Sequence, residues 1–118
     1  MLKETYIMTK TTILPSPTAK RILTQIGNNI RLARLRRNFS QDIVAKRAFI
    51  SRSTLILIEK GDPNVKFGAY VHVLISLGLT DELKNIATDD VLGRRLQDLG
   101  LSVRKRSSRI FKPKDVKE

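Results

Sequence analysis

Apolar side chains recur every three or four residues through the first part of the chain. Between residues 21 and 37 the period is that of a helix with one apolar face and arginines around the remainder. That face is expected to contain Ile22, Ile26, Ile30 and Ala33. Upstream, Pro15 and Pro17 disfavour helix, so the ordered domain is expected to begin near Thr18.

Two shorter helices are predicted next, joined by a tight turn. Ser40 suits the N-cap of a helix from Gln41 to about residue 48, and Ser51 suits the N-cap of a helix to about residue 60. The segment Gly-Asp-Pro-Asn at residues 61–64 then predicts a stop and a turn. Two short helices in this order form a candidate helix-turn-helix.

Three further helices are predicted downstream. The fourth helix should place on one face Phe67, Tyr70, Val71, Leu74 and Leu77. For residues 70–77, propensity alone would equally allow a strand. A fifth helix, capped by residues 80–82, should contain Leu83, Ile86 and Ala87.

The sixth predicted helix begins at residues 89–90 and ends at Gly100. Its apolar stripe consists of Leu92, Leu96 and Leu99. Such a stripe favours a place in the core. Contact with a second copy of the chain in a homodimer is the alternative.

The predicted fold class is therefore all-α, with four segments. Residues 1–19 are assigned to a flexible N-terminal arm and residues 20–88 to the helix-turn-helix domain. Residues 89–100 are assigned to the short C-terminal helix. Residues 101–118, with 7 Lys/Arg and 2 acidic residues, are assigned to a basic disordered tail.

Charge points to an acidic partner. The chain has 23 Lys and Arg against 11 Asp and Glu, a formal net charge of +12. Such a balance favours a polyanion such as nucleic acid, because each neutralised phosphate releases condensed counterions. A solubilising surface or a ribosome-like basic protein is the plainer alternative.

Composition also disfavours several other classes of protein. With no cysteine and with His72 as the one histidine, a metal site is not expected. No nucleophile elbow and no Gly-rich phosphate loop is present, so we expect no enzyme activity, cofactor or small-molecule ligand. No apolar run approaches about 20 residues, and the first residues lack the apolar core of a signal peptide. A cytoplasmic protein with no membrane partner is expected.

The candidate helix-turn-helix carries suitable chemistry for double-stranded DNA. Gln41 lies at a helix N-terminus, where backbone N–H groups attract a phosphate. Arg52, Ser53 and Thr54 occupy the first turn of the next helix, the part of a recognition helix that enters the major groove. Arginine can bind guanine O6 and N7 with two hydrogen bonds.

The apolar residues of this helix should divide between two roles. Leu55 and Ile58 are expected to anchor the helix to the core. Ile56 and Leu57 would then face outward, either toward thymine methyl groups or partly buried against neighbouring segments.

These positions resemble the Cro/cI-like (Xre) DNA-binding family. The residues that carry the resemblance are Ser40-Gln41, Ala45, Ala48, Ile50-Ser51, Ser53-Thr54-Leu55, Ile58-Glu59 and Gly61. The resemblance implies a five-helix fold that binds palindromic operator DNA as a homodimer. It further implies a reading edge of Ser51, Arg52, Ser53 and Thr54, in which Arg52 and Ser53 read bases. Gln41 would contact a phosphate or a base edge, and Thr54, Lys60 and Lys66 would contact phosphates.

The same resemblance makes two structural predictions. Arg34 and Glu59 should form a partly buried ion pair between the first and third helices. Phe49 falls on a turn position where the family most often keeps Gly, because the chain there commonly needs a positive φ. We expect instead an ordinary backbone conformation at Phe49, with the ring packed against the core.

The segments "KGDPNVKFGAYVHVLISLGL" and "DDVLGRRLQDLGL" are similar to a narrower group, the HipB-type antitoxins. This resemblance implies a repressor of its own operon that binds and restrains a HipA-like serine/threonine kinase toxin. The alternatives are a stand-alone phage-type or general Xre regulator, and a kinase-sequestering module with secondary DNA binding. An RNA-binding role is disfavoured, because exposed aromatic stacking residues are not expected.

Overall fold

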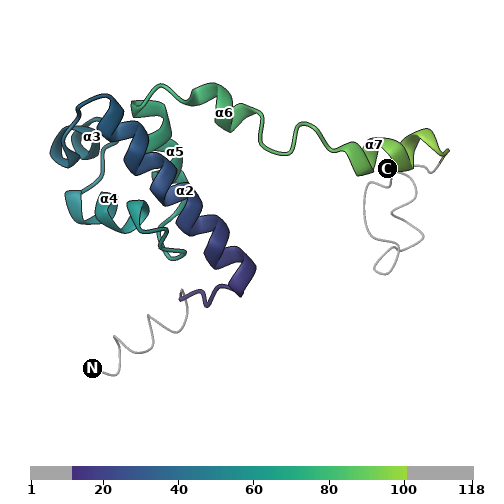
Figure 1. The fold of residues 1–118 in the computed structure, drawn as a ribbon, viewed down its shortest axis with the longest axis horizontal. Helices are drawn as coiled ribbons and strands as arrows, with labels where there is room; N and C mark the ends of the chain where they lie inside the picture. Colours follow the sequence, from purple (N-terminus) through teal and green to yellow (C-terminus); the bar gives the residue numbers. More distant parts are fainter. Residues whose placement is uncertain (1–11, 101–118) are drawn as a thin grey trace, which may run out of the picture. The chain divides into compact units, whose positions relative to one another are not determined.

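The computed structural model describes residues 12–100, and within that range every regular element is a helix (Figure 1). The all-α prediction is therefore confirmed for the described residues, and the strand considered for residues 70–77 is excluded. The predictions for residues 1–11 and for the tail at 101–118 lie outside the described residues. The helices are α2 (Pro17–Arg36), α3 (Gln41–Arg47), α4 (Arg52–Glu59), α5 (Phe67–Ser76), α6 (Thr80–Lys84) and α7 (Val91–Asp98).

The chain divides into two compact units between Lys84 and Asn85, slightly before the boundary expected at residue 88. The first unit contains α2 to α6, and the second contains α7. The core of the first unit lies among α2, α3, α4 and α5. Its buried apolar residues are Ile30, Ala33, Val44, Ala45, Ala48, Leu55, Ile58, Tyr70, Val73 and Leu77.

Helix α2 begins earlier than expected because its start is well capped. The Ser16 hydroxyl accepts a hydrogen bond from the Ala19 N–H at 3.1 Å, and Pro17 occupies the first helical turn, where it costs no hydrogen bond. Only the second half of the predicted apolar face is buried. Ile22 and Ile26 are 54% and 37% exposed, whereas Ile30 and Ala33 are buried in the core.

Helix α2 and the end of α4 touch through their backbones. A Cβ atom added to Gly27 would lie 2.6 Å from the Ile58 carbonyl oxygen, and one added to Gly61 would lie 2.5 Å from the Leu23 carbonyl oxygen. Neither position has room for a side chain. Gly61 also has a φ of +79°, the left-handed conformation that ends a helix.

The buried face of α5 is rotated from the predicted one. Tyr70 and Leu77 are buried as expected, but Val73 is fully buried, whereas Phe67 at the start of the helix is 67% exposed. The Tyr70 hydroxyl donates to the Asp62 carbonyl oxygen at 2.8 Å and so ties α5 to the loop after α4. Burial, with a smaller contribution from Asp62, raises the pKa of Tyr70 to about 12.

The last two helices depart furthest from expectation. Helix α6 ends at Lys84, so Ile86 and Ala87 fall outside it; Ile86 is 60% exposed, and Ala87 has a positive φ. Helix α7 begins as predicted, with the Asp90 carboxylate accepting from the Gly93 N–H at 3.0 Å. The prediction that its leucine stripe is core is wrong, because Leu92, Leu96 and Leu99 are all exposed.

No helix within residues 12–100 is both long and apolar enough to cross a membrane.

Candidate nucleic-acid interface

Buried apolar side chains hold helices α3 and α4 in place. Val44, Ala45 and Ala48 on one side and Leu55 and Ile58 on the other are almost fully buried. Both helices are capped as predicted: Ser40 accepts from the Ile43 N–H and Ser51 from the Thr54 N–H, each at 3.1 Å. The outer surface of α4 is therefore presented on a fixed support.

The polar side chains at the start of α4 differ in exposure and in their hydrogen-bond partners. Arg52 and Ser53 are exposed, and Thr54 is half-buried. The Ser51 hydroxyl is used by the cap, and it also lies 3.1 Å from the Ser53 hydroxyl and 2.9 Å from that of Thr54. Of the four residues expected at the reading edge, Arg52 and Ser53 are the ones most open to a ligand.

The expected ion pair between Arg34 and Glu59 is present. Arg34 donates from Nε to Glu59 Oε2 at 2.7 Å and from Nη2 to Oε1 at 3.1 Å, and the two side chains are 10% and 5% exposed. A third bond runs from Arg34 Nη1 to the Phe39 carbonyl oxygen at 3.0 Å. The pair therefore joins α2, the α2–α3 turn and the end of α4.

Gln41 connects this ion pair to the first turn of α4. Its Nε2 donates to Glu59 Oε1 at 3.2 Å, and its Oε1 accepts from Arg52 Nε at 3.4 Å. The guanidinium of Arg52 also lies 3.8 Å from the Asp42 carboxylate. Gln41, predicted as a phosphate or base-edge contact, has an internal role in the structure: it orients Arg52 through the side of the guanidinium that carries Nε.

Asp42 was not predicted as a site residue. Its carboxylate is exposed and lies beside the guanidinium of Arg52. The signal in the sequence was an acidic residue in the first turn of α3, which also suits the helix dipole and therefore did not stand out.

The turn between α3 and α4 contradicts the expectation for Phe49. This residue has a φ of +61°, and its side chain is 86% exposed. The backbone at Phe49 is therefore left-handed, and the Ile50 N–H that follows it donates to the Ala45 carbonyl oxygen at 3.0 Å. The ring contacts the exposed His72 edge-on, with 6.3 Å between centroids, and does not enter the core.

The two outward apolar residues of α4 differ in exposure. Leu57 is 41% exposed, and Ile56 is half-buried. Leu57 is thus accessible for contact with a thymine methyl group, and Ile56 is partly covered.

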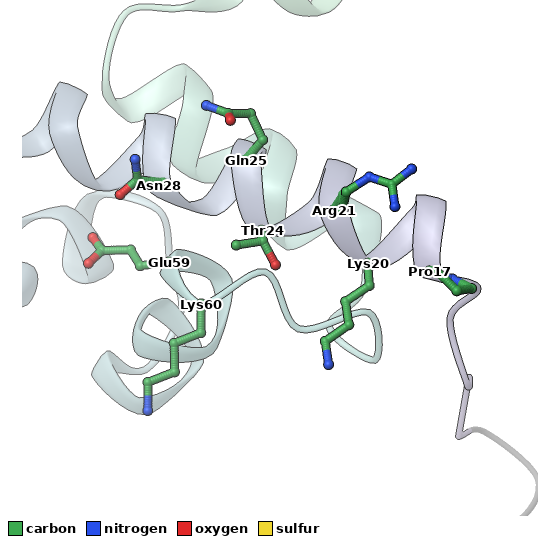
Figure 2. Close-up of a pocket in the computed structure, with 8 residues that line it drawn as sticks. All are labelled: Pro17, Lys20, Arg21, Thr24, Gln25, Asn28, Glu59 and Lys60. Carbon is green, nitrogen blue, oxygen red and sulfur yellow. The ribbon is translucent and has the colours of Figure 1, made fainter.

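The two predicted phosphate-binding lysines lie at opposite ends of the loop between α4 and α5. Lys66 is exposed at the N-cap of α5 and makes no side-chain capping bond there. Lys60 follows α4 and lines a shallow groove against α2 (Figure 2). The other lining residues are Pro17, Lys20, Arg21, Thr24, Gln25, Asn28 and Glu59. Lys20 and Arg21 were not predicted as site residues, because the sequence around them indicates only a helix.

Comparison of the chain with protein-family models, with curated proteins and with solved structures gives no match.

Proposed function

We propose that this protein is a sequence-specific DNA-binding repressor that uses α3, the turn and α4. One observation carries the proposal: Arg52 and Ser53 are exposed on the first turn of a helix whose opposite face, Leu55 and Ile58, is fully buried. A polar helix end on a rigid support is what major-groove readout requires. The net charge of +12 supports a polyanionic partner.

In this proposal the two helices have different tasks. The N-terminus of α3, capped by Ser40, receives a backbone phosphate with its N–H groups. Helix α4 enters the major groove, where Arg52 donates to guanine O6 and N7 and Ser53 contacts a neighbouring base edge. Phosphate contacts fix the position, and the base contacts supply sequence preference.

The biological setting is proposed from the resemblance described above. The protein acts as a homodimer on a palindromic operator of its own operon, and it restrains a HipA-like serine/threonine kinase as an antitoxin. The exposed leucines of α7 provide an apolar surface available to a protein partner.

Footprinting of the purified protein on its own upstream DNA tests the repressor proposal. We expect two protected half-sites about one helical turn apart. Arg52→Ala should abolish the sequence-specific protection while leaving the helical circular dichroism unchanged, because Arg52 lies outside the core. Arg36→Ala, which removes a charge from an exposed position near the end of α2, serves as the control. Protection that is absent, or unaffected by Arg52→Ala, would overturn the proposal.

Co-expression with a HipA-like kinase from the neighbouring reading frame tests the antitoxin proposal. We expect the kinase to co-purify and its toxicity to fall. If no such frame exists, or if the kinase neither binds nor is restrained, the protein is a stand-alone regulator.

A further inference from the structure

The groove beside Lys60 is positively charged and lies outside the turn that reads bases. It is lined by three cationic residues, Lys20, Arg21 and Lys60, and by one acidic residue, Glu59. The Glu59 carboxylate is already paired with Arg34 and bonded to Gln41, so it does not neutralise the lysines. Figure 2 shows the side chains of Lys20 and Lys60 extending from the same side of α2 and α4, whereas Arg21 extends another way.

The position of Lys60 next to α2 is fixed by the backbone. Gly27 admits the carbonyl groups of Ile58 and Glu59, and Gly61 is pressed against the backbone of Leu23. Lys60 stands between these two contacts. Its Cα therefore cannot move away from the second turn of α2 without separating the two helices.

Lys60 also belongs to the exposed face of α4. Ser53, Leu57 and Lys60 are spaced four and three residues apart, which places them on one side of a helix. All three are exposed, whereas Leu55 and Ile58 on the opposite side are fully buried. At 1.5 Å per residue, the axial distance from Ser53 to Lys60 is about 10 Å. The major groove of B-DNA is about 12 Å wide.

From this geometry we infer that Lys20 and Lys60 form a second phosphate-binding surface. A duplex that receives the first turn of α4 in its major groove presents one phosphate strand to the N-terminus of α3. The opposite strand reaches the C-terminal end of the same α4 face, where the two ammonium groups bind its phosphates. The inference rests on the proposed DNA binding and extends the interface beyond the helix-turn-helix to the early turns of α2.

The test is the salt dependence of binding to two duplex probes, a fragment of the protein's own upstream DNA and a random sequence of equal length. For the double variant Lys20→Ala/Lys60→Ala, the slope of log affinity against log salt should become shallower by about 0.9 for each phosphate that is no longer neutralised, about 1.8 per chain. The preference for the upstream fragment should stay unchanged, because neither lysine reads a base.

Arg36→Ala/Lys46→Ala is the matched control. It removes the same charge from exposed positions outside the groove and outside the exposed face of α4, so its slope should stay near that of the unmodified protein. Equal circular dichroism of all variants verifies folding.

Three outcomes overturn the inference and can be told apart. If the unmodified protein binds neither duplex, the proposed function fails as well. If it binds and the Lys20→Ala/Lys60→Ala slope equals that of the control, only the second surface fails. If, in that second case, the Lys20→Ala/Lys60→Ala protein also no longer co-purifies with the kinase, the groove binds an acidic protein surface instead of DNA.

Discussion

Helices α4 and α7 are alike in isolation and differ in their surroundings. Each has eight residues, and each begins with a cap whose side chain accepts a backbone N–H, from Thr54 to Ser51 in α4 and from Gly93 to Asp90 in α7. Both have an apolar stripe. The stripe of α4 is fully buried, whereas that of α7 is exposed, with Leu92 at 66% and Leu99 at 75%. Local sequence specifies a helix, but burial depends on whether other elements provide a complementary face.

Ion pairs give the sharpest test of this difference. Glu59→Ala removes the partner of a buried arginine, so we expect the free energy of unfolding to fall by about 3–5 kcal/mol. Asp89→Ala removes the ion-pair partner of Arg94 in α7, and both of these side chains are more than half exposed. It should change the free energy of unfolding by less than about 1 kcal/mol. Urea unfolding followed by circular dichroism measures both. A Glu59→Ala protein with unchanged stability would show that Arg34 finds another partner.

Apolar truncation should show the same contrast with a slightly smaller effect. Leu55 is fully buried, and Leu55→Ala should lower the free energy of unfolding by about 3 kcal/mol, because it reduces apolar burial and leaves a cavity. Leu96 is 42% exposed, and Leu96→Ala should leave it nearly unchanged. Both changes in the free energy of unfolding are measured from the shift of the denaturant midpoint, with the dependence of the free energy on denaturant concentration held constant. A large destabilisation by Leu96→Ala would mean that α7 is covered in solution, by a second copy or another segment.

Glycine substitutions test how closely the elements approach. In Gly27→Ala the new methyl group meets backbone atoms at the end of α4, which cannot rotate away. The substitution should therefore lower the free energy of unfolding by about 2 kcal/mol. In Gly93→Ala the nearest atoms to the methyl group belong to the Asp90 side chain, and α7 lies in the second unit, so the main unfolding transition of the first unit should not shift. Equal melting temperatures for the two variants would contradict the tight contact between α2 and α4.

Glycine substitutions at residues with a positive φ should have the smallest effect on stability. For Phe49 the effect should be stabilising, opposite in sign to those above. Phe49 has a φ of +61°, which costs a side-chain-bearing residue about 1–2 kcal/mol relative to glycine. Phe49→Gly should therefore raise the free energy of unfolding by about 1 kcal/mol, since its exposed ring contributes little packing. Ala87→Gly, at a φ of +62° between α6 and α7, should leave the main transition in place. Destabilisation by Phe49→Gly would show that the contact with His72 outweighs the strain.

The features that could be predicted from the sequence are those governed by neighbouring residues. Ser40 and Ser51 cap the helices that follow them. A cap of this kind needs only a side-chain oxygen three residues before the N–H group that it accepts from. The pair of Arg34 and Glu59 could be predicted only through a resemblance, since the two residues are 25 positions apart. Fold class followed from these local signals and the helical period.

The features that were missed depend on distant contacts. Nothing next to Gly27 reveals that the α4 backbone passes against it. The hydrogen bond from Tyr70 to Asp62 fixes the rotation of α5 about its axis. This rotation buries Val73 and leaves Phe67 exposed. The link from Gln41 to both Glu59 and Arg52 likewise exists only once α3 and α4 are packed.

A small contact near the start of the described chain has a consequence for synthesis. Asn64 accepts from the Ile13 N–H at 2.5 Å and donates to the Ile13 carbonyl oxygen at 3.4 Å, across 51 residues of sequence. A ribosome adds about 5–20 residues per second. Residue 13 is therefore made about 3–10 s before its partner, and the segment ahead of α2 acquires its native neighbour only after all of α4 has been translated.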